Sequence, residues 1–97
     1  MIRHIALIRF KDEVTSGDIE NLEAGLRALP EKISAIEAYA FGRDLGVSEG
    51  TWDFAIVADF ADVEAFHAYQ ADPDHVEVLA YLSRPLTAEI KRIQFEI

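Results

Sequence analysis

The spacing of hydrophobic residues changes along the chain, and each change marks a boundary between a predicted strand and a predicted helix. Residues 2–10 are apolar on both faces of an extended segment, which is typical of a strand covered on both sides. Residues 51–60 alternate most regularly and form the strongest predicted strand. One face of that strand carries Trp52, Phe54, Ile56, Ala58 and Phe60. Two further strands are predicted within residues 33–45 and 88–97.

Helical spacing separates these strands. Between Asp18 and Leu29, apolar residues three and four positions apart form one buried stripe. Ser16 or Asp18 is expected to cap this helix, and Pro30 is expected to limit it. A second helix is expected to begin after a cap at Asp62.

Residues 72–75 combine two aspartates with a proline and predict a break in that second helix. A short third helix is expected to follow, with Val76, Leu79 and Leu82 on its buried side. Pro85 is expected to end it before the last strand.

The predicted order of elements is β-α-β-β-α-β, which indicates an α+β, ferredoxin-like domain. Right-handed crossovers place both main helices on one face of a four-stranded antiparallel sheet. The other face would then be bare, although three of the strands carry apolar residues on both sides. We therefore expect a homodimer that forms through this open sheet face.

Composition narrows the range of partners and locations. A length of 97 residues fits one domain that spans residues 1–97. The net charge of −9 argues against binding to nucleic acid or to an anionic membrane surface. The absence of cysteine excludes disulfides, thiolate nucleophiles and cysteine-ligated zinc. We expect a cytoplasmic protein, because the chain starts directly with a strand pattern and lacks a long apolar run.

Two stretches resemble a known family, the stress-responsive A/B barrel (Dabb) domains. Residues 2–11 are similar to the first strand of that family, and residues 69–76 are similar to the Tyr-x-x-His-Pro-x-His stretch of its second helix. The resemblance covers nearly the whole chain and implies a dimeric α+β barrel. A plant polyketide cyclase of this family works without metal or cofactor, in a pocket between the sheet and the helices. Its catalytic tyrosine and histidine match Tyr69 and His75, and a further pocket histidine matches His4.

The sequence departs from the family pattern at two positions of the implied pocket. Asp72 stands where the second-helix stretch has its first histidine. Asp53 stands where the cyclase has a third pocket histidine. The residue types of the pocket therefore differ from those of the cyclase.

Each residue of interest also has an ordinary structural interpretation. His75 suits proton transfer near neutral pH, but it also fits a capping role at the start of a helix. Tyr69 could donate a hydrogen bond to a substrate oxygen, or it could extend the apolar core of its helix. His4 shares a strand face with apolar residues, where a hydrogen-bonded core histidine is the commoner case. Asp53 either orients a histidine or lies in water at the edge of the sheet.

The sequence thus predicts a pocket whose catalytic pair is His75 and Tyr69. The predicted substrate-binding residues around the pair are His4, Asp53, Ala6, Ile8, Phe66 and Leu79. No cofactor is expected, and no metal site, because the histidines and acids are scattered and the glycines lack a phosphate-binding spacing. Three functions stay open: a cofactor-independent enzyme of the cyclase or lyase type, a binder of a small apolar or aromatic ligand, and a structural or stress-related dimer with a filled core.

Overall fold

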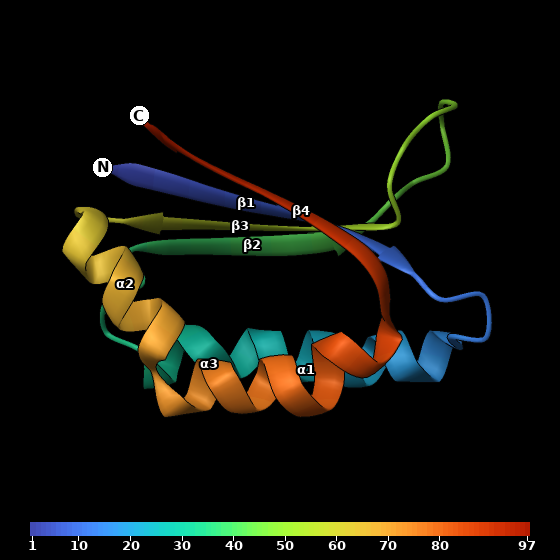
Figure 1. Ribbon diagram of the computed structural model, residues 1–97, viewed down its shortest axis with the longest axis horizontal. Coiled ribbons are helices and arrows are strands. Elements are labelled where there is room, and N and C mark those ends of the chain that lie inside the picture. Colours follow the sequence, from blue (N-terminus) through green and yellow to red (C-terminus); the bar gives the residue numbers. More distant parts are fainter.

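In the computed structural model, which describes residues 1–97, a layer of helices lies against one face of a four-stranded antiparallel sheet (Figure 1). The elements are β1 (Ile2–Phe10), α1 (Ser16–Lys32), β2 (Ala38–Arg43), β3 (Phe54–Phe60), α2 (Val63–Ala71), α3 (Pro73–Val78), a π-helical turn (Leu79–Ser83), a 3-10 turn (Arg84–Leu86) and β4 (Thr87–Glu96). The strand order is β2-β3-β1-β4. The fold is therefore α+β and ferredoxin-like, as the element order predicts.

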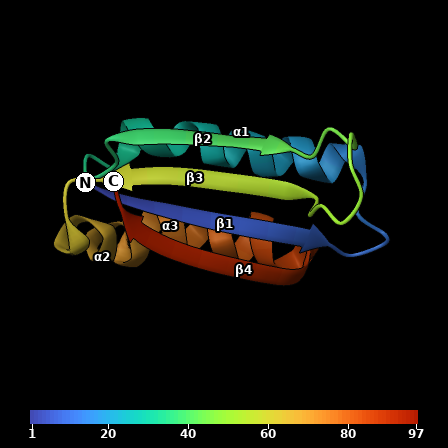
Figure 2. The same cartoon turned by 90° about the horizontal axis from the view of Figure 1, so that it is seen from above.

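The sheet separates a face that the helices cover from a face that they leave open (Figure 2). Alternation along β1 buries His4, Ala6 and Ile8 on the helix side, while Ile5 and Leu7 are half-buried on the other side. The largest fully buried side chains of the core are Phe54, Phe60, Ile8, Leu22 and Leu29. The core thus lies between the sheet and the helices.

Helix α1 is longer at both ends than the sequence predicts. Its cap is Thr15, not Ser16 or Asp18: the Thr15 hydroxyl accepts the Asp18 N–H, and the Asp18 carboxylate accepts the Thr15 N–H. The expectation that Pro30 limits the helix is also wrong, because Pro30 lies inside its last two turns. There the missing N–H removes one hydrogen bond near the helix end, and burial of Leu29 holds the turn in place.

The junction of α2 and α3 follows the prediction closely. The Asp62 carboxylate caps α2 by accepting the Ala65 N–H at 2.8 Å. Asp72 ends α2 and caps α3 by accepting the Asp74 N–H at 2.9 Å, and Pro73 occupies the first turn of α3. The chain therefore turns sharply without an intervening loop.

One side chain of the third helical segment differs from its predicted position. Val76 is 47% exposed, because the buried position of α3 belongs to His75. Val78 and Leu82 instead pack against Gly25 of α1, where an added Cβ would overlap Leu82. Close approach of the two helical segments therefore depends on a residue without a side chain.

Strand β3 begins at Phe54, three residues later than predicted, so Trp52 does not continue the apolar face of the strand. Residues 44–53 form a loop that rises from the sheet on the side away from the helices (Figure 1). The Asp44 carboxylate accepts the Thr51 hydroxyl at 2.8 Å inside this loop. Trp52 lies under the Arg9 guanidinium, 4.5 Å from the ring centre.

The open face of the sheet carries apolar side chains that this chain does not cover. Ile93 is 58% exposed and Phe95 is 42% exposed, and Leu7 and Val57 are half-buried beside them. None of the helices is both long and apolar enough to cross a membrane.

Candidate functional site

A cavity of about 260 Å³ lies between the sheet and the α2–α3 segment. We call it the histidine cavity. Its walls are formed by His4, Ala6, Ile8, Ile56, Tyr69, Gln70, His75, Leu79, Ser83, Arg84, Ile90 and Arg92. Most of the apolar walls come from strands, and the polar groups come from both layers. Of the 12 lining residues 6 are hydrophobic and the others are polar, so the cavity combines apolar surface with the convergent polar groups of a small-molecule site.

The strand register explains how the sheet contributes to the cavity. Tyr39, Ala58, His4 and Gln94 pair in one row across all four strands. Ala6, two residues along β1 from His4, is buried and lines the cavity, and its short side chain leaves room next to the His4 ring. Space beside an imidazole is therefore built into the sheet.

The helix break brings Tyr69 and His75 together. The two residues are six positions apart, a spacing that a continuous helix would not place on one face. Because the chain turns at Asp72, the ring centres lie 4.0 Å apart with an interplanar angle of 33°. Both side chains are buried and both line the histidine cavity. The predicted pair therefore does converge on a cavity.

His75 presents an unprotonated nitrogen. Its Nδ1 lies 3.4 Å from the Gln70 carbonyl oxygen, which can only accept, so Nδ1 carries the proton and Nε2 has the free lone pair. Burial lowers the pKa of His75 below its ordinary value, and the positive charge of Arg92 lowers it further. The Gln70 carbonyl and Asp72 oppose this shift. The ring is thus neutral at neutral pH and can act as a base.

His4 has the opposite tautomer. The Gln94 Nε2 donates to its Nδ1 at 2.8 Å, which leaves the proton on Nε2. Burial lowers the pKa of His4 to about 4, and the charges of Arg92 and His75 add to that shift. His4 therefore stays neutral and offers one N–H donor. One imidazole of the cavity can accept a proton while the other can donate a hydrogen bond.

Two tyrosines lie in this region of the protein, Tyr69 on α2 and Tyr39 on β2. Burial raises the pKa of Tyr69, so its phenol keeps its proton and can donate. Burial also raises the pKa of Tyr39, whose hydroxyl is buried without a hydrogen-bond partner. The Tyr69 hydroxyl lies near it but outside hydrogen-bond geometry. An unpaired buried hydroxyl costs about 1–3 kcal/mol.

Two of the predicted substrate-binding residues lie outside the histidine cavity. Asp53 is exposed beyond the start of β3, where its carboxylate accepts the Phe10 N–H at 2.8 Å. Of the two interpretations of Asp53, the one in which it orients a cavity histidine is wrong, because β3 starts only at Phe54 and Asp53 does not line the cavity. The other, in which it lies in water, agrees with its exposure. Phe66 packs against the His4 ring, with centres 5.0 Å apart, and does not line the cavity. The other four, His4, Ala6, Ile8 and Leu79, do line it.

Sequence reasoning missed several polar residues of the site. Arg92 and Gln94 are on β4 at alternate positions with Ile90, on the strand face that meets the helices. Arg84 comes from the 3-10 turn before β4. Arg92 and Gln94 follow the helix-facing Ile90 at every second position of β4. This alternation is a sequence signal that could have found these two residues. The structure contains no group of three His, Cys, Asp or Glu side chains able to hold a metal ion.

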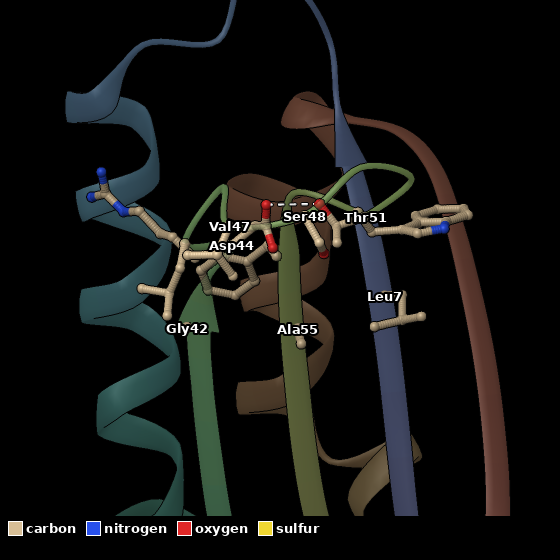
Figure 3. A pocket seen from close by; sticks show the side chains of 11 residues that line it. Leu7, Gly42, Asp44, Val47, Ser48, Thr51 and Ala55 are labelled. Carbon is tan, nitrogen blue, oxygen red and sulfur yellow. Dashed lines mark hydrogen bonds between the residues drawn. The ribbon is translucent and has the colours of Figure 1, made fainter.

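A larger hollow, of about 510 Å³, lies on the open face beneath the 44–53 loop (Figure 3). We call it the loop hollow. Leu7 and Ala55 form part of its floor, and Val47 and Thr51 come from the loop. It contains no histidine or tyrosine, and its one carboxylate, Asp44, already accepts the Thr51 hydroxyl and the Gly46 N–H. The loop hollow is therefore larger than the histidine cavity but lacks the side chains that acid–base chemistry needs.

A family model described as Stress responsive A/B Barrel Domain matches residues 2–97. Among curated proteins, the chain is similar to the stress-response A/B barrel domain-containing protein HS1 of Arabidopsis thaliana. The two are 31% identical over 78 residues, which cover 78% of this chain and 72% of the relative.

Solved structures share the whole fold. A dimeric ferredoxin-like protein of unknown function from Thermobifida fusca has a TM-score of 0.92 and 44% identity, covering 99% of this chain and 90% of that one. Hydroxynitrile lyase from Passiflora edulis has a TM-score of 0.87 and 21% identity, covering 99% and 92%. Further ferredoxin-like neighbours from Bacteroides fragilis and Jannaschia are also dimeric.

Proposed function

The chain belongs to the stress-responsive A/B barrel domain family, and we propose that it binds a small, largely apolar molecule in the histidine cavity and transfers a proton on it without a cofactor. One observation carries the proposal. Two neutral histidines of opposite tautomer and a buried phenol meet in one cavity. A filled structural core would have no use for this arrangement, so the cavity supports ligand binding over the structural alternative.

The groups suit removal of a proton from carbon next to a carbonyl, or from a hydroxyl. His75 Nε2 takes the proton, and the electron pair moves onto the carbonyl oxygen. The Tyr69 hydroxyl and the His4 Nε2–H donate to that oxygen as its negative charge grows. The proton then returns from His75 to the product. No redox partner is needed for these steps.

The proposal includes assembly as a homodimer through the open face. The uncovered apolar side chains of β1, β3 and β4 support it, because a contiguous patch of this kind is unfavourable in water. The dimeric state of several structural neighbours supports it as well. The Passiflora edulis lyase is similar only at the level of the fold, and it supports no more than the capacity of this fold to hold an enzyme site.

The test uses phenylacetone, a neutral aryl ketone with acidic C–H groups beside its carbonyl. In D2O, NMR spectroscopy would follow exchange of those hydrogens with and without the protein. We expect catalysed exchange, and we expect His75→Gln to reduce it about 100-fold. The matched control is His67→Gln, because His67 is an exposed histidine of α2 and does not line the histidine cavity.

Equal exchange rates for the wild type and His75→Gln would contradict the assignment of the base. Binding of phenylacetone with no catalysed exchange would favour the second candidate function, a ligand-binding protein without turnover. The neutral histidines and the Tyr69 hydroxyl would then serve recognition alone.

A further inference from the structure

The six arginines of the chain divide into two groups by their partners. Arg3 pairs with Asp59 and Arg43 pairs with Glu23. Arg9 and Arg27 lie over the rings of Trp52 and Phe41. The remaining two, Arg84 and Arg92, form no ion pair, side-chain hydrogen bond or contact over an aromatic ring, and both line the histidine cavity.

No carboxylate lines the cavity beside these two cations, although the charge of Asp72 reaches His75 from outside the lining. None of the residues lining the cavity is Asp or Glu, although the chain has 18 of them and a net charge of −9. Arg92 lies on the same strand face as Gln94, opposite Ala6 in the register, and its charge acts on both His4 and His75. Arg84 comes from the 3-10 turn on the helix side. The cavity is therefore a positive site in an acidic protein.

We infer that the histidine cavity takes a small molecule with one carboxylate group and an apolar body, and that Arg84 and Arg92 bind the carboxylate. This rests on the proposed function and adds the class of ligand. A guanidinium can pair with a carboxylate through two parallel N–H···O bonds. The apolar walls from Ile8, Ile56 and Leu79 require that the rest of the molecule be apolar. A volume of about 260 Å³ fits a body of one aromatic ring.

The orientation of the ligand follows from the placement of the cations. Both arginines are exposed, whereas Tyr69 and His75 are buried. A carboxylate held by the arginines would stay at the cavity mouth and remain partly hydrated. The apolar body, with its reactive C–H, would then point inward toward the His75 Nε2. Recognition and proton transfer would use different ends of one molecule.

The experiment compares phenylacetate and cinnamate with their neutral primary amides, titrated into the protein and followed by amide chemical shifts in NMR spectra. We expect each acid to bind at least about tenfold more tightly than its amide at low salt. The double variant Arg84→Gln/Arg92→Gln should lose this preference and bind the amides as the wild type does. Arg27→Gln, which removes the same charge from the outer surface of α1, should keep it. The preference should also shrink at ~0.5 M salt, where exposed charges are screened.

Equal affinity of acids and amides, with shift changes at His4 and His75, would overturn the carboxylate inference and leave the proposed function in place. A preference for acids that survives in the double variant would overturn the assignment of the two arginines. If no acid and no amide changes the spectrum, while phenylacetone also fails to exchange, both the inference and the proposed function fall.

Discussion

The two faces of the sheet carry hollows of different size and different chemistry. The loop hollow on the open face is about 510 Å³, and the histidine cavity on the helix face is about 260 Å³. The smaller one holds both buried histidines, a buried phenol and two unpaired arginines. The larger one is lined by aliphatic, aromatic and polar side chains, and its one carboxylate is already hydrogen-bonded within its loop. We therefore propose acid–base chemistry for the face that the helices cover and assembly for the other face.

The largest effect that we expect is on dimer formation through the open face. Ile5→Asp places a carboxylate in the middle of that face, between Val57 and Ile93 in the register, where no cation can pair with it. In a single chain the new carboxylate would be in contact with water, but a dimer would bury two such charges without partners. We therefore expect the dissociation constant of the dimer to rise by about 1000-fold or more. Sedimentation velocity across a concentration series would measure this. Ala24→Asp, on the exposed side of α1, is the control that should stay dimeric.

Removing one hydroxyl tests the chemistry of the helix face. Tyr69→Phe keeps the ring that packs against His75 but removes the donor to the substrate oxygen. We expect catalysed exchange of phenylacetone to fall by about 10- to 100-fold, with the dimer unchanged. A rate equal to that of the wild type would mean that Tyr69 is only a packing residue.

Acidic pH should lower the free energy of unfolding of the protein, because His4 is buried in its neutral form. Its pKa is about 4 in the folded protein and 6.5 in the unfolded chain, so the unfolded chain binds more protons between these values. The stabilisation is fully present above pH 6.5 and is lost as the pH falls toward 4. We expect a loss on the order of 2 kcal/mol, measured by urea unfolding at several pH values.

His4→Gln isolates this contribution, since it removes the titrating group from the row beside Gln94. The dependence of its free energy of unfolding on pH should be shallower than that of the wild type over the same range. His67→Gln, at an exposed position, should leave the dependence unchanged. Parallel curves for the wild type and His4→Gln would contradict the buried neutral state of His4.

The smallest effect has the opposite sign. Tyr39→Phe removes a buried hydroxyl that has no hydrogen-bond partner, so we expect the free energy of unfolding to rise by about 1 kcal/mol. Thermal or urea unfolding would measure it. A loss of stability would show that the hydroxyl is paired in solution.

The sequence predicted the fold well because the fold depends on periodicity. Alternation in β1 placed His4, Ala6 and Ile8 on one face, and the Asp62 cap placed the start of α2. The ends of α1 were predicted less accurately. Thr15 caps the helix in place of Ser16 because it forms a reciprocal pair of hydrogen bonds with Asp18, and Pro30 is accommodated in the last turns of the packed helix.

The site was predictable only where a local motif fixed it. The break before His75 brings that ring to Tyr69, and the family resemblance pointed to the same pair. Arg84 and Arg92 had no such signal, since an arginine is ordinarily a surface residue, and only the tertiary fold shows which arginines lack a partner. Asp53 was misplaced because alternation was extended past the true start of β3. The cavity volume depends on how side chains from seven elements fit together, and no local sequence pattern contains that information.

The direct joint at Asp72 has a kinetic consequence. Because α2 ends and α3 begins at one residue, no flexible linker separates Tyr69 from His75. The two rings hold their mutual position before any ligand arrives, so binding carries little reorganisation cost at this pair. Association should then be limited by passage between Arg84 and Arg92 at the mouth, where opposite charge speeds the approach of an anion. A ligand would meet a site that is already assembled, and its residence time, rather than its arrival, would distinguish one acid from another.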